Sequence, residues 1–180
     1  MTQRLWIIAL ASVVVAVPMS TPVARAVRES RCTVAQLRIT VGHSFAADQV
    51  AGANIRFMNR SRRACWMHGW PILVFAGPLG KTAKAEEAPD QAFANVEHIG
   101  DPVVLLRPKQ RADAVFDGAD GPMSGRATCG HGFRTISVTP PGDSRHATVS
   151  AWIAWLGAYM PPCSEIGVSP ILPSTAVYMG

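Results

Sequence analysis

The eight residues ACWMHGWP (64–71) bring a thiol, a thioether, an imidazole and two indoles into one short stretch. Cys65, Met67 and His68 are ligand types that exported copper and zinc proteins use. Another histidine, His131, stands in the tripeptide CGH, but no H-x-x-x-H spacing links these side chains. The stretch therefore has two interpretations: a metal-handling site that uses Met67, His68 and His131, or a structural corner. We favour the corner and predict no metal and no cofactor.

Serine, histidine and carboxylate side chains give only weak signs of catalysis. The segment GPMSG places its serine one position late for the G-x-S-x-G elbow of a hydrolase. Ser124, His131 and Asp120 would form the triad of a small hydrolase, which is a further alternative. Asp113 and Asp117 would lie about 13 Å apart on one face of a strand that rises roughly 3.3 Å per residue, too far apart for a pair of glycosidase carboxylates. We therefore predict solvated outer-face aspartates and no enzymatic activity.

Tryptophan is the other residue type with binding chemistry, because an indole has a large apolar face and a polar edge. Trp66, Trp152 and Trp155 form a candidate ligand or partner surface if their rings are exposed, since clustered exposed rings mark an interface. Buried rings would instead fill the core. The partner of such a surface would be an envelope protein, a glycan or a small apolar ligand.

The N-terminal residues match a secretory signal peptide. One positive charge precedes the apolar run LWIIALASVVVAV, and the tripeptide ARA (24–26) forms an A-x-A cleavage site. The run is shorter than the roughly 20 residues of a membrane-spanning helix, so we expect cleavage and no stable membrane span, with an uncleaved anchor as the alternative. The chain then consists of a signal peptide (1–26) and one domain (27–180), whose core covers about 32–172.

Export also decides how cysteines and charge are interpreted. An even number of cysteines in an exported chain indicates two disulfides. The four cysteines are Cys32, Cys65, Cys129 and Cys163. Removal of Arg4 and Arg25 lowers the formal charge from +5 to +3, and the remaining positive charges are scattered apart from RSRR (60–63). Nucleic-acid binding calls for a basic face, so we predict a secreted or cell-envelope protein that binds no nucleic acid.

Alternating apolar and polar residues predict antiparallel strands. In TVAQLRITV (33–41) the apolar set faces one way, with Arg38 and Thr40 on the other side, and AGANIRFMN (51–59) alternates similarly. The continuous apolar run PILVFA (71–76) is typical of a strand that is covered on both faces. PVVLL, ADAVF and RTISVTP add three short strands, separated by turns that contain Gly and Pro. Six or seven such strands predict an antiparallel β-sandwich.

Two segments do not follow this pattern. Residues 77–100 are polar and predict a flexible crossover between the two sheets. Residues 147–160, ATVSAWIAWLGAYM, fit both the strand period and the helix period. We favour a strand there.

Several short motifs follow one another in a characteristic order. A cysteine precedes the first strand, F-x-N-x-S ends the second, and C-x-x-x-G-[aromatic]-P leads into the third. A later cysteine precedes a strand that ends in PPG, and a last cysteine precedes the closing strand. The residues concerned are Cys32, Phe57, Asn59, Ser61, Cys65, Gly69, Trp70, Pro71, Cys129, 140–142 and Cys163. From about Cys32 to Ile171, this succession resembles an exported actinobacterial family that is defined by the domain of unknown function 4232.

The resemblance implies an immunoglobulin-like antiparallel β-sandwich of about seven strands outside the membrane, and no established reaction. In a sandwich of this order the start of the first strand and the end of the second share an edge. The implied pairing is Cys32–Cys65 and Cys129–Cys163, although three connectivities are possible in principle. The leading hypothesis is a secreted or cell-envelope, non-catalytic binding module. A copper- or zinc-handling envelope protein is the alternative, followed by a small hydrolase.

Overall fold

The computed structural model describes residues 29–47, 50–88, 100–119, 132–154, 156–160 and 165–176. These residues form fifteen strands and three short 3₁₀ helices, without an α-helix among them, so the predicted all-β class is confirmed. The strands outnumber the seven or so expected, because several are only two or three residues long. Within these ranges, no helix is long and apolar enough to cross a membrane. The predicted signal peptide (1–26) lies outside the described residues.

The larger sheet contains six strands. Its order is β2 (Leu37–Ala47), β3 (Val50–Asn59), β9 (Arg111–Ala119), β14 (Gly167–Val168) and β7 (Glu86–Glu87), and β15 (Leu172–Pro173) also pairs with β9. β2 and β3 form a long antiparallel hairpin with a register shift between Val41 and Ser44. The predicted alternation holds at the end of β3, where Ile55 and Phe57 lie in the core and Arg56, between them, is on the outer face. It fails earlier in the strand, because Gly52 and Asn54, expected on the outer face of a half-buried strand, are buried.

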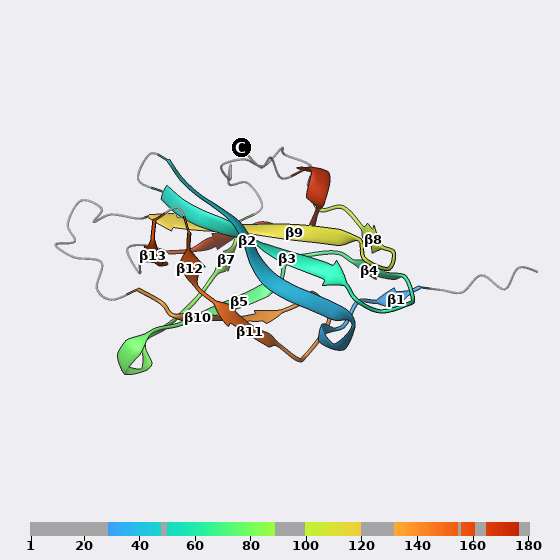
Figure 1. Cartoon of the computed structure of the whole chain (residues 1–180), viewed down its shortest axis with the longest axis horizontal. Helices are drawn as coiled ribbons and strands as arrows, with labels where there is room; N and C mark the ends of the chain where they lie inside the picture. The colour runs from blue at the N-terminus through green and yellow to red at the C-terminus, as the bar shows by residue number, and fades with distance from the viewer. Residues whose placement is uncertain are drawn as a thin grey trace, which may run out of the picture.

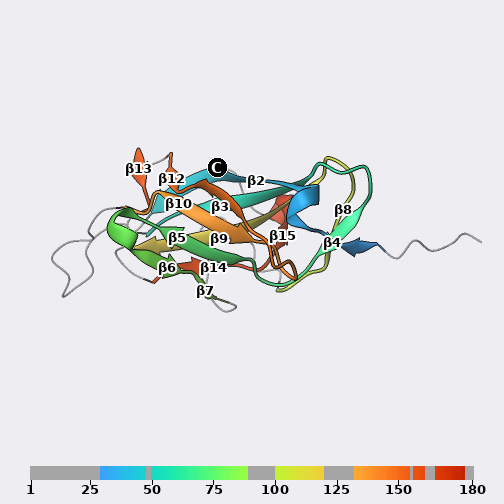
Figure 2. The same ribbon diagram turned by 90° about the horizontal axis from the view of Figure 1, so that it is seen from below.

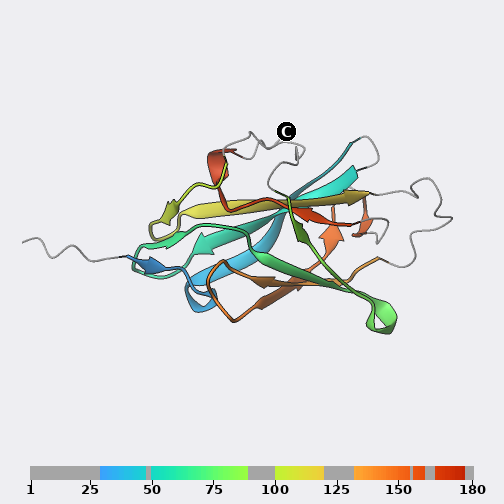
Figure 3. The same ribbon diagram turned by 180° about the vertical axis from the view of Figure 1, so that it is seen from behind.

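The second sheet has four strands and faces the larger one. Its order is β11 (Ala147–Ser150), β10 (Thr135–Thr139), β5 (Ile72–Ala76) and β6 (Thr82–Lys84). The two sheets lie one above the other in Figures 1 and 3. Buried side chains of both sheets form one hydrophobic cluster, in which the rings of Phe75 and Phe116 meet edge to face with centroids 5.3 Å apart. Apolar burial between the sheets therefore holds the domain together.

Two small sheets lie at opposite ends of the molecule (Figures 1 and 2). At one end, β4 (Cys65–Met67) pairs with β1 (Ser30–Arg31) and with β8 (Val104–Leu106). At the other end, β12 (Trp152–Ile153) pairs with β13 (Ala158–Tyr159). The strand preference at 147–160 is therefore confirmed for β11, β12 and β13.

The structure corrects the local predictions at two places. Residues Val34–Gln36 form a 3₁₀ helix, η1, where a strand was expected, because the amide oxygen of Gln36 accepts hydrogen bonds from the backbone N–H and the hydroxyl of Thr33 and closes a turn. The polar segment after β5 crosses between the sheets as predicted, but 77–88 are ordered. They form η2 (Pro78–Gly80), β6 on the second sheet and β7 on the larger one.

β5 and β9 differ from the burial that was expected for them. β5 is covered on one face only, since Leu73 and Phe75 are buried while Ile72 is 46% exposed. The prediction of solvated aspartates is wrong, because Asp113 and Asp117 are 2% and 3% exposed. β9 is flanked by β3 on one edge and by β14 and β15 on the other, and the 3₁₀ helix η3 (Ser174–Ala176) packs against it.

The buried carboxylate of Asp113 is held by two neighbours. Its Oδ1 accepts a hydrogen bond of 2.6 Å from Nδ2 of Asn54 and lies 3.5 Å from Nε of Arg56. A buried charge is tolerated when it is paired and hydrogen-bonded in this way. Asp113 therefore has a structural role: its carboxylate links β9 to Asn54 and Arg56 of β3.

Candidate functional site

The alternation of β4 divides the ACWMHGWP stretch between the core and the surface. Cys65 and Met67 are buried, whereas Trp66 and His68 are partly exposed. Cys65 forms the predicted disulfide with Cys32, which is therefore confirmed. A cysteine in a disulfide cannot bind a metal, and the thioether of Met67 belongs to the hydrophobic core.

The corner that follows β4 is organised by Asp101. Gly69 has a positive φ of 94°, which glycine adopts without strain. Its N–H donates to Oδ1 of Asp101 at 3.0 Å, and Oδ2 of the same carboxylate lies 3.2 Å from Nε2 of His68. Pro71 then precedes β5, where the missing N–H breaks no ladder hydrogen bond. The structural interpretation of Cys65, Gly69 and Pro71 fits this geometry.

Trp66 is held in a defined orientation on the outer face of the small sheet. Its indole Nε1–H donates to the backbone carbonyl of Glu29 at 3.0 Å. The guanidinium carbon of Arg31 lies 4.5 Å from the centroid of the indole ring, a cation–π contact. Strand pairing aligns Arg31, Trp66 and Leu105 in one row across β1, β4 and β8.

Two apolar side chains in and just before β8, the strand beside Trp66, are exposed to solvent. Leu105 is 40% exposed and Val103, two residues earlier on the same chain segment, is 68% exposed. We call this surface the Trp66 face; it consists of Arg31, Trp66, His68, Val103 and Leu105. It combines an apolar centre with charged or titratable groups at its margin.

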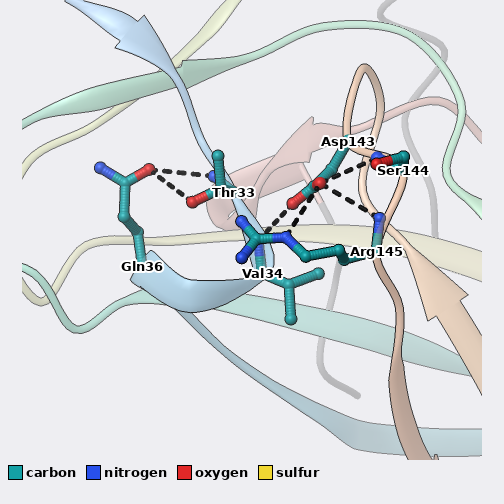
Figure 4. Close-up of polar contacts among 6 residues, drawn as sticks. All are labelled: Thr33, Val34, Gln36, Asp143, Ser144 and Arg145. Carbon is teal, nitrogen blue, oxygen red and sulfur yellow. Dashed lines mark hydrogen bonds and ion pairs between the residues drawn. The ribbon is translucent and has the colours of Figure 1, made fainter.

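The PPGD turn lies against the side chain of Arg31, one member of the Trp66 face. A side chain on Gly142 would meet the guanidinium of Arg31 at 2.5 Å, so the glycine leaves room for Arg31 to reach the indole. The carboxylate of Asp143 accepts hydrogen bonds from the N–H groups of Val34 (2.8 Å), Ser144 (2.8 Å) and Arg145 (3.1 Å) (Figure 4). The bond from Val34 is the main reason why the pKa of Asp143 lies below its ordinary value of 3.8.

The tryptophans of the predicted surface do not form one patch. Trp152 is 45% exposed on β12, where its ring meets that of Tyr159 edge to face with centroids 5.2 Å apart. β12 and β4 belong to different sheets at opposite ends of the molecule (Figure 1). Trp155 lies outside the described residues. Of the two that the structure describes, Trp66 is the one that strand pairing places beside an exposed apolar side chain, that of Leu105.

The structure describes only some of the residues predicted for the metal site, the hydrolase triad and the second disulfide. His68 pairs with Asp101, and the part of the chain that the structure describes contains no group of three or more His, Cys, Asp or Glu side chains arranged for a metal ion. His131, which completes the metal alternative, is outside the described residues, as are Asp120 and Ser124 of the hydrolase alternative. Cys129 and Cys163 are outside them too, so their pairing remains a prediction.

Sequence reasoning missed Arg31, Val103 and Leu105 as partners of Trp66. The alternation within PVVLL was a usable signal, because it places Val103 and Leu105 on one face and the buried Val104 and Leu106 on the other. Which face is exposed, however, depends on the pairing of β8 with β4.

A comparison with models of known protein families found one family that matches most of this chain. The model of a family described as a domain of unknown function (DUF4232) matches residues 32–171, which include the disulfide, the corner after β4 and the PPGD turn. Searches of curated proteins and of solved structures found no match. Because the family model covers well over half of the chain, the protein belongs to the DUF4232 family.

Proposed function

We propose that the protein is a non-catalytic binding module that acts outside the cytoplasm, secreted or at the cell envelope. Its Cys32–Cys65 disulfide supports this location, because such bonds persist in oxidising compartments. The signal-like N-terminal sequence points the same way. We further propose that the two facing sheets form an immunoglobulin-like sandwich and that Cys129 and Cys163 form a second disulfide.

The Trp66 face is the observation that carries the binding function. Large apolar side chains on the outer face of a sheet lose contact with water only when something covers them. Trp66 and Arg31 are also the residue types that most often dominate the free energy of protein–protein binding. Both are already held in place, by the carbonyl of Glu29 and by the cation–π contact, so little side-chain freedom is lost on binding.

We infer that the partner is a protein of the envelope. The centre of the face is apolar, and its margin contains Arg31 and the His68–Asp101 pair. A partner that fits would present an apolar patch with a carboxylate near Arg31 and a hydrogen-bonding group near His68. Such an apolar core within a polar rim is typical of protein interfaces.

Substitution of Leu105 by Asp tests this proposal. Leu105 is exposed, so the variant should fold, but a partner would have to desolvate the new carboxylate and lose an apolar contact of about 1.5–3 kcal/mol. We expect the affinity for an envelope protein that the wild type captures to fall at least about tenfold. Binding would be measured by capture from envelope extract, followed by titration of the captured protein.

Leu79→Asp is the matched control, because Leu79 is 93% exposed in η2, away from the Trp66 face. Its φ of 60° is also one that Asp tolerates. The control should bind as the wild type does, and Val103→Asp should behave like Leu105→Asp. Equal binding by all four proteins, or equal losses in Leu79→Asp and Leu105→Asp, would exclude the Trp66 face as the binding surface.

A further inference from the structure

Three arginines from three neighbouring strands lie on the outer face of the larger sheet. Strand pairing aligns Arg38 with Met58 and Met58 with Arg111, and it aligns Thr40 with Arg56 in the adjacent row. Paired residues project to the same side of a sheet, and the core side is occupied by their chain neighbours, such as Phe57 and Ala112. The arginines of β2, β3 and β9 therefore point away from the core.

These side chains surround a hollow of about 220 Å³, which we call the arginine hollow. Its lining consists of Arg38, Thr40, Arg56, Met58 and Arg111. β2 and β9 are separated by β3 alone, so the backbones of Arg38 and Arg111 are roughly 10 Å apart. Arginine side chains are long enough to converge over Met58 from that distance, with Arg56 on the adjacent row.

The hollow carries positive charge that the neighbouring residues do not offset. Arg56 is paired with the buried carboxylate of Asp113, 3.5 Å from its Nε. Within the described residues, neither Arg38 nor Arg111 makes an ion pair, and both are exposed. Arg38 and Arg111 therefore contribute two positive charges that no carboxylate of the described residues pairs. An anion bound between these two side chains would be attracted by both charges.

We propose that the arginine hollow binds a phosphate group, in the form of a phosphate monoester or inorganic phosphate. A phosphate monoester carries a charge of roughly −1.5 to −2 at pH 7, which matches the combined charge of Arg38 and Arg111. Its several oxygens can accept hydrogen bonds from more than one guanidinium fork and from the hydroxyl of Thr40 at once. A single carboxylate has one charge and two oxygens, which a single arginine satisfies.

This site is distinct from the Trp66 face. It lies on the larger sheet and uses none of the residues of the Trp66 face. Loss of phosphate binding would therefore leave the proposed protein-binding function standing, and the Leu105→Asp variant should bind phosphate as the wild type does.

Titration of the purified protein with inorganic phosphate at pH 7 tests the site directly. We expect saturable one-to-one binding by calorimetry. The backbone amide signals that shift in NMR spectra should belong to 38–40, 56–58 and 111, which locates the site without any variant. Sodium acetate at the same ionic strength should bind at least about tenfold more weakly.

Arg38→Gln and Arg111→Gln should each weaken phosphate binding about tenfold or more, since each removes one fork of charge-assisted donors. Both side chains are exposed, so both variants should fold, which circular dichroism would check. Lys84→Gln is the matched control, because it removes one positive charge from β6 on the other sheet. The control should retain wild-type affinity.

Vesicles distinguish a soluble ligand from a lipid headgroup. Vesicles that contain phosphatidic acid present a phosphate monoester, and vesicles of phosphatidylcholine serve as the neutral comparison. If the wild type sediments with the phosphatidic acid vesicles and Arg38→Gln does not, the ligand of the hollow is a membrane headgroup. If the wild type binds inorganic phosphate but does not sediment, the ligand is a soluble phosphorylated molecule. Three results would overturn the proposal: no binding of either probe, equal binding of acetate, or an equal loss in Lys84→Gln.

Discussion

At the end of β3, Asn59 shows how one buried polar side chain can organise a bend. Its Nδ2 donates to the carbonyls of Arg63 and Leu106, each at 2.8 Å. Its Oδ1 accepts hydrogen bonds from the N–H (2.9 Å) and the hydroxyl (2.8 Å) of Ser61. The asparagine is 0% exposed, so the hydrogen bonds within the protein satisfy an amide that water cannot reach. The F-x-N-x-S motif is thus a core phenylalanine followed by a bend that Asn59 and Ser61 close.

Asn59→Ala should lower the free energy of unfolding by about 1–3 kcal/mol, because it removes the hydrogen bonds that this buried amide makes, including the one to the buried carbonyl of Leu106. Asn59→Asp should cost at least as much, since it replaces the donating amide by an acceptor that faces two carbonyls. Ser61→Ala should cost less, because the hydroxyl of Ser61 is only partly buried. Urea unfolding measures all three. Equal stability of Asn59→Ala and the wild type would show that the bend does not depend on this amide.

At the scale of elements, the PPGD turn between β10 and β11 is fastened to η1, more than one hundred residues earlier in the chain. The N–H of Val34, at the start of η1, has no partner within a helix of three residues, and the carboxylate of Asp143 supplies one at 2.8 Å (Figure 4). The same carboxylate holds the turn through Ser144 and Arg145. One side chain therefore ties the second sheet to the segment that precedes the larger sheet.

Asp143→Asn should lower the free energy of unfolding at pH 7 by about 1 kcal/mol, because a neutral acceptor forms weaker hydrogen bonds. Folding lowers the pKa of this carboxyl below 3.8, so its contribution is present above that pH and is lost as the pH falls through the lower pKa of the folded state. The wild type and the variant should therefore converge as the pH falls below 3.8 and through the lower pKa of the folded state. Glu87→Gln, which removes an exposed carboxylate from β7, is the control and should show no such convergence. If the difference in unfolding free energy between the wild type and Asp143→Asn persisted in acid, the charged form of Asp143 would not be its cause.

For the molecule as a whole, the Cys32–Cys65 disulfide joins the start of the domain to the end sheet that carries the Trp66 face. The bond links residues 33 positions apart, and the backbone N–H of Cys32 donates to the carbonyl of Trp66 at 2.9 Å. Both cysteines are buried in the core between the sheets. The bond therefore fastens the segment that carries Arg31 beside β4.

A Cys32→Ala, Cys65→Ala double variant should be less stable than the wild type by about 3–4 kcal/mol, the loop-closure effect expected for this separation. Urea unfolding under oxidising conditions measures the difference. Reductant added to the double variant then tests the second pair: a further loss of stability is expected if Cys129 and Cys163 are bonded. No loss in the double variant itself would contradict a stabilising role for the first bond.

Local sequence patterns were sufficient to predict many of the strands and the faces of their side chains, because strand geometry links sequence position to side-chain direction. Side chains alternate between the two faces of a strand, so the sequence alone placed Phe57 inward and Arg38 and Arg56 outward, and it located β3, β5, β9 and β10 within a few residues. The ordered motifs likewise implied the Cys32–Cys65 pairing and the family. These properties depend on neighbours in the chain.

Tertiary structure decided the features that depend on which strands meet. The sequence predicted that Asp113 is solvated, but strand pairing places Arg56 and Leu172 beside it and brings Asn54 into contact with its carboxylate, and the side chain is buried. The alternation of residues in the sequence does not show which side chains lie beside Trp66; the pairing of β4 with β8 places Leu105 there. The tertiary structure also places Trp152 in another sheet, at the other end of the molecule. The arginines that are scattered in the sequence gather around one hollow because the registers of β2, β3 and β9 align them. Register and packing are set by contacts between distant segments, which a local pattern does not contain.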